Sequence, residues 1–307
     1  MRKHLWRAIQ AVIGLVIIFF LVRDVAANWD KIRESQLKWE FRPLYLLAAV
    51  LLTWTMYAML IATWRRFLFD WGGQLRFLVA ARIWAVSSLG KYLPGKVWAI
   101  AGMAIMAQRA GVPPWSATAS AILLQGLAVG SGVVVVGLSD TAALEAQYPL
   151  LHPVLWVLAV GSAAGVLLMV SPGLSGLVLR RFMNTSEIQA PRPGTIALGI
   201  MANLTAWVGY GIAFWFLARG TLPEAHFPIS VAIAAFTASY LAGLIFLIAP
   251  GGLLVREGFM LLMLQGSIGP GNAAALAVAS RLMLTLTEIG IAVPFLLFPR
   301  ENTRVAT

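Results

Sequence analysis

Apolar residues occur along the chain in long runs that short polar or charged stretches separate. A helix needs about 20 mainly apolar residues to cross a hydrocarbon core of about 30 Å. Six runs approach or exceed this length, and each predicts a membrane-spanning helix. They are Ala8–Val22, Pro43–Trp64, Ser116–Leu138, Leu151–Val170, Thr195–Leu217 and Ala273–Phe298.

Two further apolar regions are each interrupted by a Pro-Gly pair. Phe77–Ala107 is cut at Pro94-Gly95, and Ile229–Gln265 is cut at Pro250-Gly251. Because proline cannot continue a helix and glycine weakens one, each region is expected to form two helices or half-helices joined at the break. The sequence therefore predicts an all-α polytopic integral membrane protein with about six full spans and two re-entrant or broken helix pairs.

The composition excludes a water-soluble fold. Apolar residues make up 60% of the 307 positions and charged residues 11%, and the mean hydropathy is +0.83, whereas soluble domains carry about 25% charged residues. We expect one membrane domain over residues 1–307. Cysteine is absent, which excludes disulfides, thiolate metal sites and a cysteine nucleophile.

The formal net charge of +11 reflects membrane orientation better than nucleic-acid binding, because the basic residues form short clusters beside the apolar runs. If each interrupted region returns to the face it entered, most of these clusters share one side. The positive-inside rule then places this side, and with it both termini, in the cytoplasm. We expect a multi-pass protein of the bacterial inner (cytoplasmic) membrane. The clusters contain Arg2, Lys3, Arg7, Arg65, Arg66, Arg76, Arg109, Arg180, Arg181, Arg192, Arg300 and Arg304.

This topology makes the two interrupted regions enter the membrane from opposite faces. Each is followed by a Gly/Pro turn and a full span, so residues 77–138 and 229–298 form two half-repeats. One constant shift along the chain places the first Pro-Gly pair on the second. Inverted repeats with interrupted helices at corresponding positions indicate a transporter whose binding site lies near the membrane midplane.

The first break combines two ammonium groups and a phenol, in Lys91, Tyr92, Pro94, Gly95 and Lys96. If the short helix that follows begins inside the membrane, its first N–H groups lack partners and its dipole favours an anion. A phosphate-bearing head group suits such a place. An ordinary interfacial turn, whose lysines reach water or lipid phosphate, is the open alternative.

The second break contains Pro250, Gly251 and Gly252, followed one turn later by Arg256 and Glu257. The glycines allow a backbone or a ligand to approach closely. Neighbouring residues on a helix point about 100° apart, so Arg256 and Glu257 need not pair with each other. The alternative is a charged pair that faces the surface at the start of a helix.

The last span carries Arg281, Thr285 and Glu288 on one helical face. Ionisable residues at membrane depth are costly unless they face a protein interior or a wet cavity, so they are functional candidates. The alternative is an internal Arg281–Glu288 ion pair that fixes helix packing.

Other polar residues inside spans are expected to form packing hydrogen bonds. These are Gln125, Asn203, Trp207 and Tyr210. The three histidines have no metal-ligand spacing, and the sequence contains neither a P-loop nor a Gly-x-Ser-x-Gly elbow. The sequence therefore predicts no metal, no cofactor and no catalytic residue.

The runs Gly90–Lys96 and Pro250–Gly258, together with Arg281, resemble the lysylphosphatidylglycerol synthase transmembrane-region family, also described as flippase-like. The resemblance covers Pro43–Phe298. The position of Leu254 is commonly a glycine in the family's motif. The family is related to the membrane domain of multiple peptide resistance factor, in which a soluble aminoacyltransferase makes aminoacylated phosphatidylglycerol and the membrane domain flips it.

The resemblance implies a lipid flippase or scramblase-like transporter rather than an enzyme. Its substrate would be an aminoacylated phospholipid, a glycolipid or a polyprenyl-linked lipid, supplied by a separate lipid-synthesising enzyme. The family's motifs correspond here to Tyr92–Lys96, Pro250–Glu257 and Arg281. Two alternatives stay open: an intramembrane enzyme in which Glu257 or Glu288 acts as acid or base, and a non-transporting scaffold of an envelope-synthesis complex.

Overall fold

A computed structural model of the chain describes residues 39–93, 97–139, 191–245 and 252–297, with the isolated residues 23, 157, 160, 161 and 164. The predicted spans Ala8–Val22 and Leu151–Val170 fall outside the continuous ranges. Five residues of the two predicted breaks also lie outside the described residues: Pro94, Gly95, Lys96, Pro250 and Gly251.

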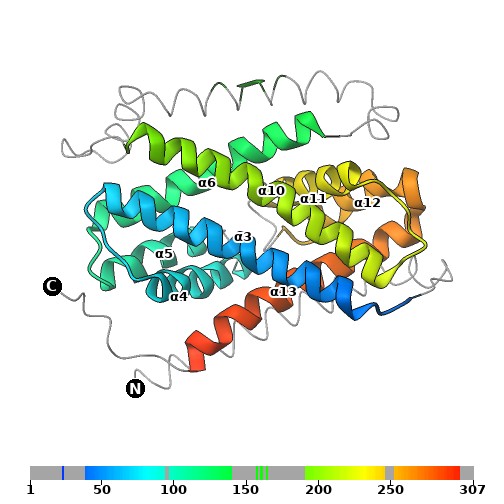
Figure 1. Cartoon of the computed structure of the whole chain (residues 1–307), viewed down its shortest axis with the longest axis horizontal. Helices are drawn as coiled ribbons and strands as arrows, with labels where there is room; N and C mark the ends of the chain where they lie inside the picture. Colours follow the sequence, from blue (N-terminus) through cyan, green and yellow to red (C-terminus); the bar gives the residue numbers. More distant parts are fainter. Residues whose placement is uncertain are drawn as a thin grey trace.

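Within the described ranges the fold is entirely helical, which confirms the predicted class (Figure 1). Four of these helices are long and apolar enough to cross a membrane: α3, α6, α10 and α13. In chain order the elements are α3 (Pro43–Asp70), α4 (Phe77–Ser88), the 3-10 turn η1 (Leu89–Tyr92), α5 (Val97–Arg109), α6 (Pro114–Leu138), α10 (Pro193–Thr221), α11 (Ile229–Ile245), α12 (Val255–Ile268) and α13 (Pro270–Leu297).

The spanning helices are longer than the apolar runs that predicted them. α3 continues to Asp70 instead of ending at Trp64, and it carries two arginines in its last turns. Arg65 Nε donates a hydrogen bond to the Leu75 carbonyl at 2.8 Å. This bond satisfies a donor of Arg65, which lies beyond the apolar run. The helix therefore includes charged residues that hydropathy alone would assign to a loop.

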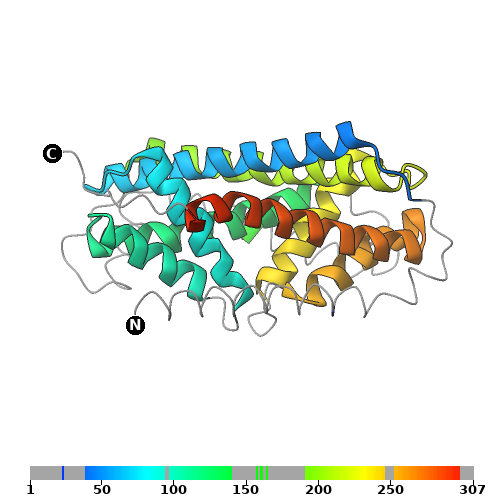
Figure 2. The same ribbon diagram turned by 90° about the horizontal axis from the view of Figure 1, so that it is seen from below.

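The helices α3 and α10 lie side by side and antiparallel (Figures 1 and 2). At one end the Glu40 amide donates to the Thr221 carbonyl at 3.0 Å, and at the other the Arg192 amide donates to the Asp70 carboxylate at 3.2 Å. Glycines on α10 leave room for side chains of α3, as in other closely packed membrane helices. The facing pairs are Gly199 with Phe67, Gly209 with Met56, and Gly220 with Leu46.

The first interrupted pair, α4 and α5 with η1 between them, is a helical hairpin. The rings of Trp71, before it, and Trp115, after it, lie 5.8 Å apart, so the chain returns to the end from which it started. The pair α11 and α12 forms a second hairpin at the other end, since Figure 2 places the start of α13 where α10 ends. Each interrupted region thus forms a pair of short helices that lie side by side, as the Pro-Gly breaks predict.

Burial distinguishes the outer helix α3 from the central helix α13. In the most apolar 18-residue stretch of α3, 28% of the residues are buried, whereas in that of α13 the share is 67%. Leu44, Leu47 and Leu51 of α3 are exposed by 79%, 54% and 49%. A surface this apolar is suited to lipid, while α13 carries its ionisable residues into the protein interior.

The loop before α12 has an unusual backbone. Leu254 has φ 64° and ψ −34°, and among the described residues it is the one non-glycine with positive φ. Gly252 lies so close to Gly243 of α11 that a Cβ on it would be 2.8 Å from the Gly243 Cα. The left-handed conformation costs an L-residue about 1–2 kcal/mol, which explains why a glycine at position 254 suits this turn.

We therefore expect Leu254→Gly to stabilise the protein by about 1 kcal/mol, because it removes this strain while the 44% exposed side chain contributes little packing. Thermal unfolding in detergent would show a raised melting temperature. The neighbouring Leu253, which is buried, provides the control: Leu253→Gly should lower the melting temperature. A fall for both variants would contradict strain at position 254.

A second expectation concerns the contact between α10 and α11. A Cβ on Gly211 would lie 2.5 Å from the Cα of Ile233, and backbone cannot move aside as a flexible side chain can. Gly211→Ala should therefore destabilise the protein by about 1–3 kcal/mol. Gly126→Ala in α6, where a Cβ meets nothing within 4 Å, should leave the melting temperature unchanged or raise it. Equal melting temperatures for the two variants would contradict this close contact.

Candidate functional site

A cavity of about 280 Å³ lies where the two hairpins meet the spanning helices, and every helix given above contributes to its lining. Most of its wall is apolar or aromatic. Among the described residues, four side chains that are charged at neutral pH reach it: Lys91 from η1, Arg256 from α12, and Arg281 and Glu288 from α13. An apolar pocket with a few convergent polar groups is the usual form of a small-ligand site.

Glu288 joins three parts of the structure at this cavity. Its Oε1 accepts hydrogen bonds from the Lys91 ammonium and, at 3.1 Å, from the Tyr57 hydroxyl of α3. The Tyr92 hydroxyl lies 3.1 Å from Glu288 Oε2 and 3.0 Å from Thr285 Oγ1. One carboxylate on the central helix therefore holds the tip of the first hairpin and an outer helix together.

A second ion pair joins α12 to α13. Arg281 Nη1 contacts Glu257 Oε1, and the two side chains are only 4% and 3% exposed. The interpretation of Arg281 and Glu288 as one internal ion pair is wrong. Lys91 and Glu257 approach α13 at different levels, so each α13 residue has a partner from a different hairpin.

Arg256 and Glu257 diverge, as expected for neighbours on a helix, and both are buried. Arg256 Nη2 donates to Ser280 Oγ at 2.9 Å. Its guanidinium lies over the rings of Phe236 and Tyr240, 5.3 and 5.2 Å from their centroids. Within the described ranges no carboxylate lies within ion-pair distance of Arg256. The described contacts of this cation are therefore with neutral groups.

Among the described residues, the charged groups of the cavity therefore leave one positive charge without a counter-ion. Lys91 with Glu288 is neutral as a pair wherever the shared proton resides, and Arg281 with Glu257 is neutral as well. Arg256 keeps its charge because a guanidinium does not deprotonate in proteins. An uncompensated cation away from water is costly, so this cavity favours an anionic ligand.

Eight of the thirteen residues that the sequence singles out can be placed. Seven line the cavity, and Glu257 pairs with one of them, so the structure brings both hairpins and the last helix together. The other five lie among the residues that the structure does not describe. The seven are Lys91, Tyr92, Gly252, Arg256, Arg281, Thr285 and Glu288.

Sequence reasoning missed three residues that position the charges: Tyr57, Tyr240 and Ser280. Each lies in an apolar stretch where only a hydroxyl distinguishes it from packing residues. A tyrosine in the middle of a span was an available signal, because a buried phenol usually finds a hydrogen-bond partner. Nothing local identified Ser280 as the partner of Arg256.

The polar residues expected to serve packing also line the cavity. Asn203 Nδ2 donates to a backbone carbonyl of its own helix at 2.8 Å, and Trp207 Nε1 donates to the Ala128 carbonyl of α6 at 2.9 Å. These bonds have the expected packing role. The ring of Trp207 additionally lies 5.5 Å from that of Tyr240, so it forms part of the aromatic wall.

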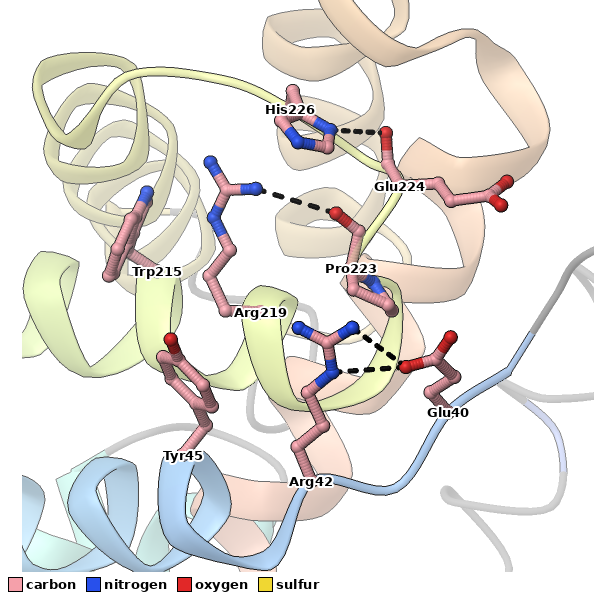
Figure 3. A pocket seen from close by; sticks show the side chains of 8 residues that line it. All are labelled: Glu40, Arg42, Tyr45, Trp215, Arg219, Pro223, Glu224 and His226. Atoms are coloured by element: carbon pink, nitrogen blue, oxygen red, sulfur yellow. Dashed lines mark hydrogen bonds and ion pairs between the residues drawn. The ribbon is translucent and has the colours of Figure 1, made fainter.

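A second, more open hollow of about 590 Å³ lies where α3 begins and α10 ends (Figure 3). Its basic groups already have partners. Arg42 contacts Glu40 at 2.8 Å, while Arg219 donates to the Pro223 carbonyl at 3.4 Å and lies over the ring of Trp215. Arginine stacked on tryptophan at a helix end is typical of an anchor at the membrane interface. The central cavity is the better candidate site.

The Lys91–Glu288 pair gives a prediction about stability. Glu288→Leu should destabilise the protein by about 2 kcal/mol or more, because it leaves Lys91 without its carboxylate; the usual cost of about 3–5 kcal/mol is reduced since Lys91 is 25% exposed. The double variant Lys91→Met with Glu288→Leu should recover much of this loss in thermal unfolding. If the loss of stability in the double variant equals the sum of the losses in the two single variants, the Lys91–Glu288 interaction is not confirmed and the prediction is wrong.

A comparison with known protein families gives a match over residues 7–289 to the family described as lysylphosphatidylglycerol synthase TM region. The matched range contains both hairpins and all the ionisable residues of the cavity. No curated protein and no solved structure matches the chain. The resemblance to this family is thereby confirmed, and the chain belongs to the lysylphosphatidylglycerol synthase TM region family.

Proposed function

We propose that this protein is a flippase or scramblase that carries a phosphate-bearing lipid across the bilayer. The head group enters the central cavity while the tails stay among lipid. The observation that carries the proposal is Arg256, a buried cation that lines the cavity and has no carboxylate partner among the described residues. Of its five N–H donors, one is engaged by Ser280, and a guanidinium can bind phosphate through two donors at once.

The arrangement of the helices supports transport. A long helix, a hairpin and a second long helix occur in the order α3, α4, α5, α6 and again in the order α10, α11, α12, α13. Because α3 and α10 are antiparallel, the two sets enter from opposite ends, as an inverted repeat requires. The contacts of Lys91 and Arg256 with α13, at Glu288 and Ser280, bring both hairpins to the middle of that helix.

The distribution of charge supports the proposed orientation. Arg65, Arg76, Arg109 and Arg192 lie near helix ends on one side of the described structure, where the single acidic neighbour given above is Asp70. The other end carries Glu40 and Glu224 beside Arg42 and Arg219. The positive-inside rule places the first end in the cytoplasm. We further propose that the protein lies in the cytoplasmic membrane of a bacterium, with both termini on the cytoplasmic side.

We propose that the protein moves the lipid across the bilayer without changing it chemically. Glu257 and Glu288, the two carboxylates of the site, are each held by a cation. A carboxylate engaged in this way is poorly suited to act as a general base. Synthesis of the lipid would belong to a separate enzyme.

Lipid movement in reconstituted vesicles tests the proposal. Fluorescent lipids extracted from the native membrane would be incorporated, and their transfer between leaflets followed by chemical quenching from outside. We expect Arg256→Gln to slow transfer about tenfold or more, since a charge-assisted hydrogen bond is worth about 1.5–3 kcal/mol. Arg219→Gln, which removes an arginine from the end of α10, should move lipid at the wild-type rate.

Two results would contradict the proposal. One is wild-type transfer by a folded Arg256→Gln protein, which would exclude the buried cation from the mechanism. The other is recovery of chemically altered lipid after incubation, detected by mass spectrometry, which would favour the intramembrane enzyme.

A further inference from the structure

One aromatic ring in the central cavity lies close to a cation from each hairpin. The centroid of the Tyr240 ring is 6.0 Å from Lys91 Nζ in the first hairpin and 5.2 Å from Arg256 Cζ in the second. We propose that Tyr240 is a positioning residue whose ring holds both cations at the cavity and thereby links the two hairpins. The inference rests on the proposed function, because both cations line the cavity in which the lipid phosphate is proposed to bind.

The ring of Tyr240 is itself held by neighbours that carry no charge. It packs edge to face on Trp207 of α10, with centroids 5.5 Å apart, and it stacks on Phe236 of α11 at 6.0 Å. The helices that carry these rings are in close contact where Gly211 of α10 meets the backbone of Ile233 of α11. Because these contacts fix the ring, the two flexible cationic side chains take their positions from it.

The contact with Lys91 crosses between the hairpins. Tyr240 and Arg256 belong to α11 and α12, the two arms of the second hairpin, whereas Lys91 lies at the tip of the first. The face of an aromatic ring carries partial negative charge and attracts an ammonium or a guanidinium within about 6 Å. One ring therefore draws the charged ends of two hairpins toward the same part of the cavity wall.

An aromatic ring restrains a cation without removing its capacity to bind an anion. Arg256 donates a hydrogen bond to Ser280, but a guanidinium has five N–H donors. Lys91 donates to Glu288, but an ammonium has three donors. The ring face does not replace a phosphate oxygen as an acceptor. A phosphate therefore meets cations that are already in place, and its binding has to order less of the site.

A series of phenylalanines with increasing fluorine content at position 240 tests this attraction. Fluorine withdraws electron density from the ring face and weakens its hold on a cation, while the size of the ring changes little. Tyr240→Phe should move fluorescent lipids of the native membrane at a rate within about twofold of the wild-type rate. Phenylalanines with one, two and three fluorines should be progressively slower, by about tenfold for three, because the contacts with both cations weaken.

The same series at Phe214 provides the matched control. This buried ring packs on Phe227 and Phe236, and its fluorination should produce no trend in the rate. Equal rates across the series at position 240, in folded proteins that move lipid, would overturn the role of Tyr240 and leave the proposed function standing. Failure of the wild-type protein to move lipid would contradict both.

A double-mutant cycle tests the link between the hairpins. Lys91→Met and Tyr240→Leu remove the same contact, so the double variant should move lipid about two- to fivefold faster than the product of the single effects predicts. Lys91→Met combined with Trp215→Leu, which removes a ring near the outer end of α10, should give effects that multiply. Effects that multiply for Lys91 and Tyr240 as well would overturn the link.

Discussion

The cost of placing ionised side chains inside a membrane protein constrains the rest of this structure. Arg281 and Glu288 lie on the central helix α13, far from either end, and neither can be left unpaired at that depth. The partners come from the hairpins: Glu257 from α12 and Lys91 from η1. The two hairpins must therefore reach the middle of α13 from opposite ends, and the cavity is the space that remains where they meet.

The close packing of α10 fixes this arrangement. Its glycines bring α3 within reach on one side, and Gly211 brings the backbone of α11 into contact on another. Because α3 carries Tyr57 and α11 carries Tyr240, the same contacts deliver two phenols to the charged site. Small residues on one helix thus determine where polar groups of two others lie, a relation common in membrane proteins.

Arg256 differs from the other cations because serine and two aromatic rings hold it without neutralising it. Such a residue can gain a counter-ion from a ligand without first breaking an ion pair. The two existing pairs serve a different purpose, since they join η1 and α12 to α13. Two ion pairs therefore stabilise the fold, while Arg256 remains able to bind an anion. The proposed transport of an anionic head group depends on this difference.

The sequence by itself determined the helical class, the two interrupted pairs and the shared face of Arg281, Thr285 and Glu288, because hydropathy, proline chemistry and helical periodicity act locally. Only the tertiary structure decided which cation each carboxylate binds. Helical spacing fixes the side on which a residue lies, but the level at which another hairpin meets it depends on packing of distant segments. For that reason the alternative of an Arg281–Glu288 ion pair is wrong. A tyrosine within a span was a signal for Tyr57 and Tyr240, but the charged group that each of them and Ser280 contacts could not be predicted from the sequence.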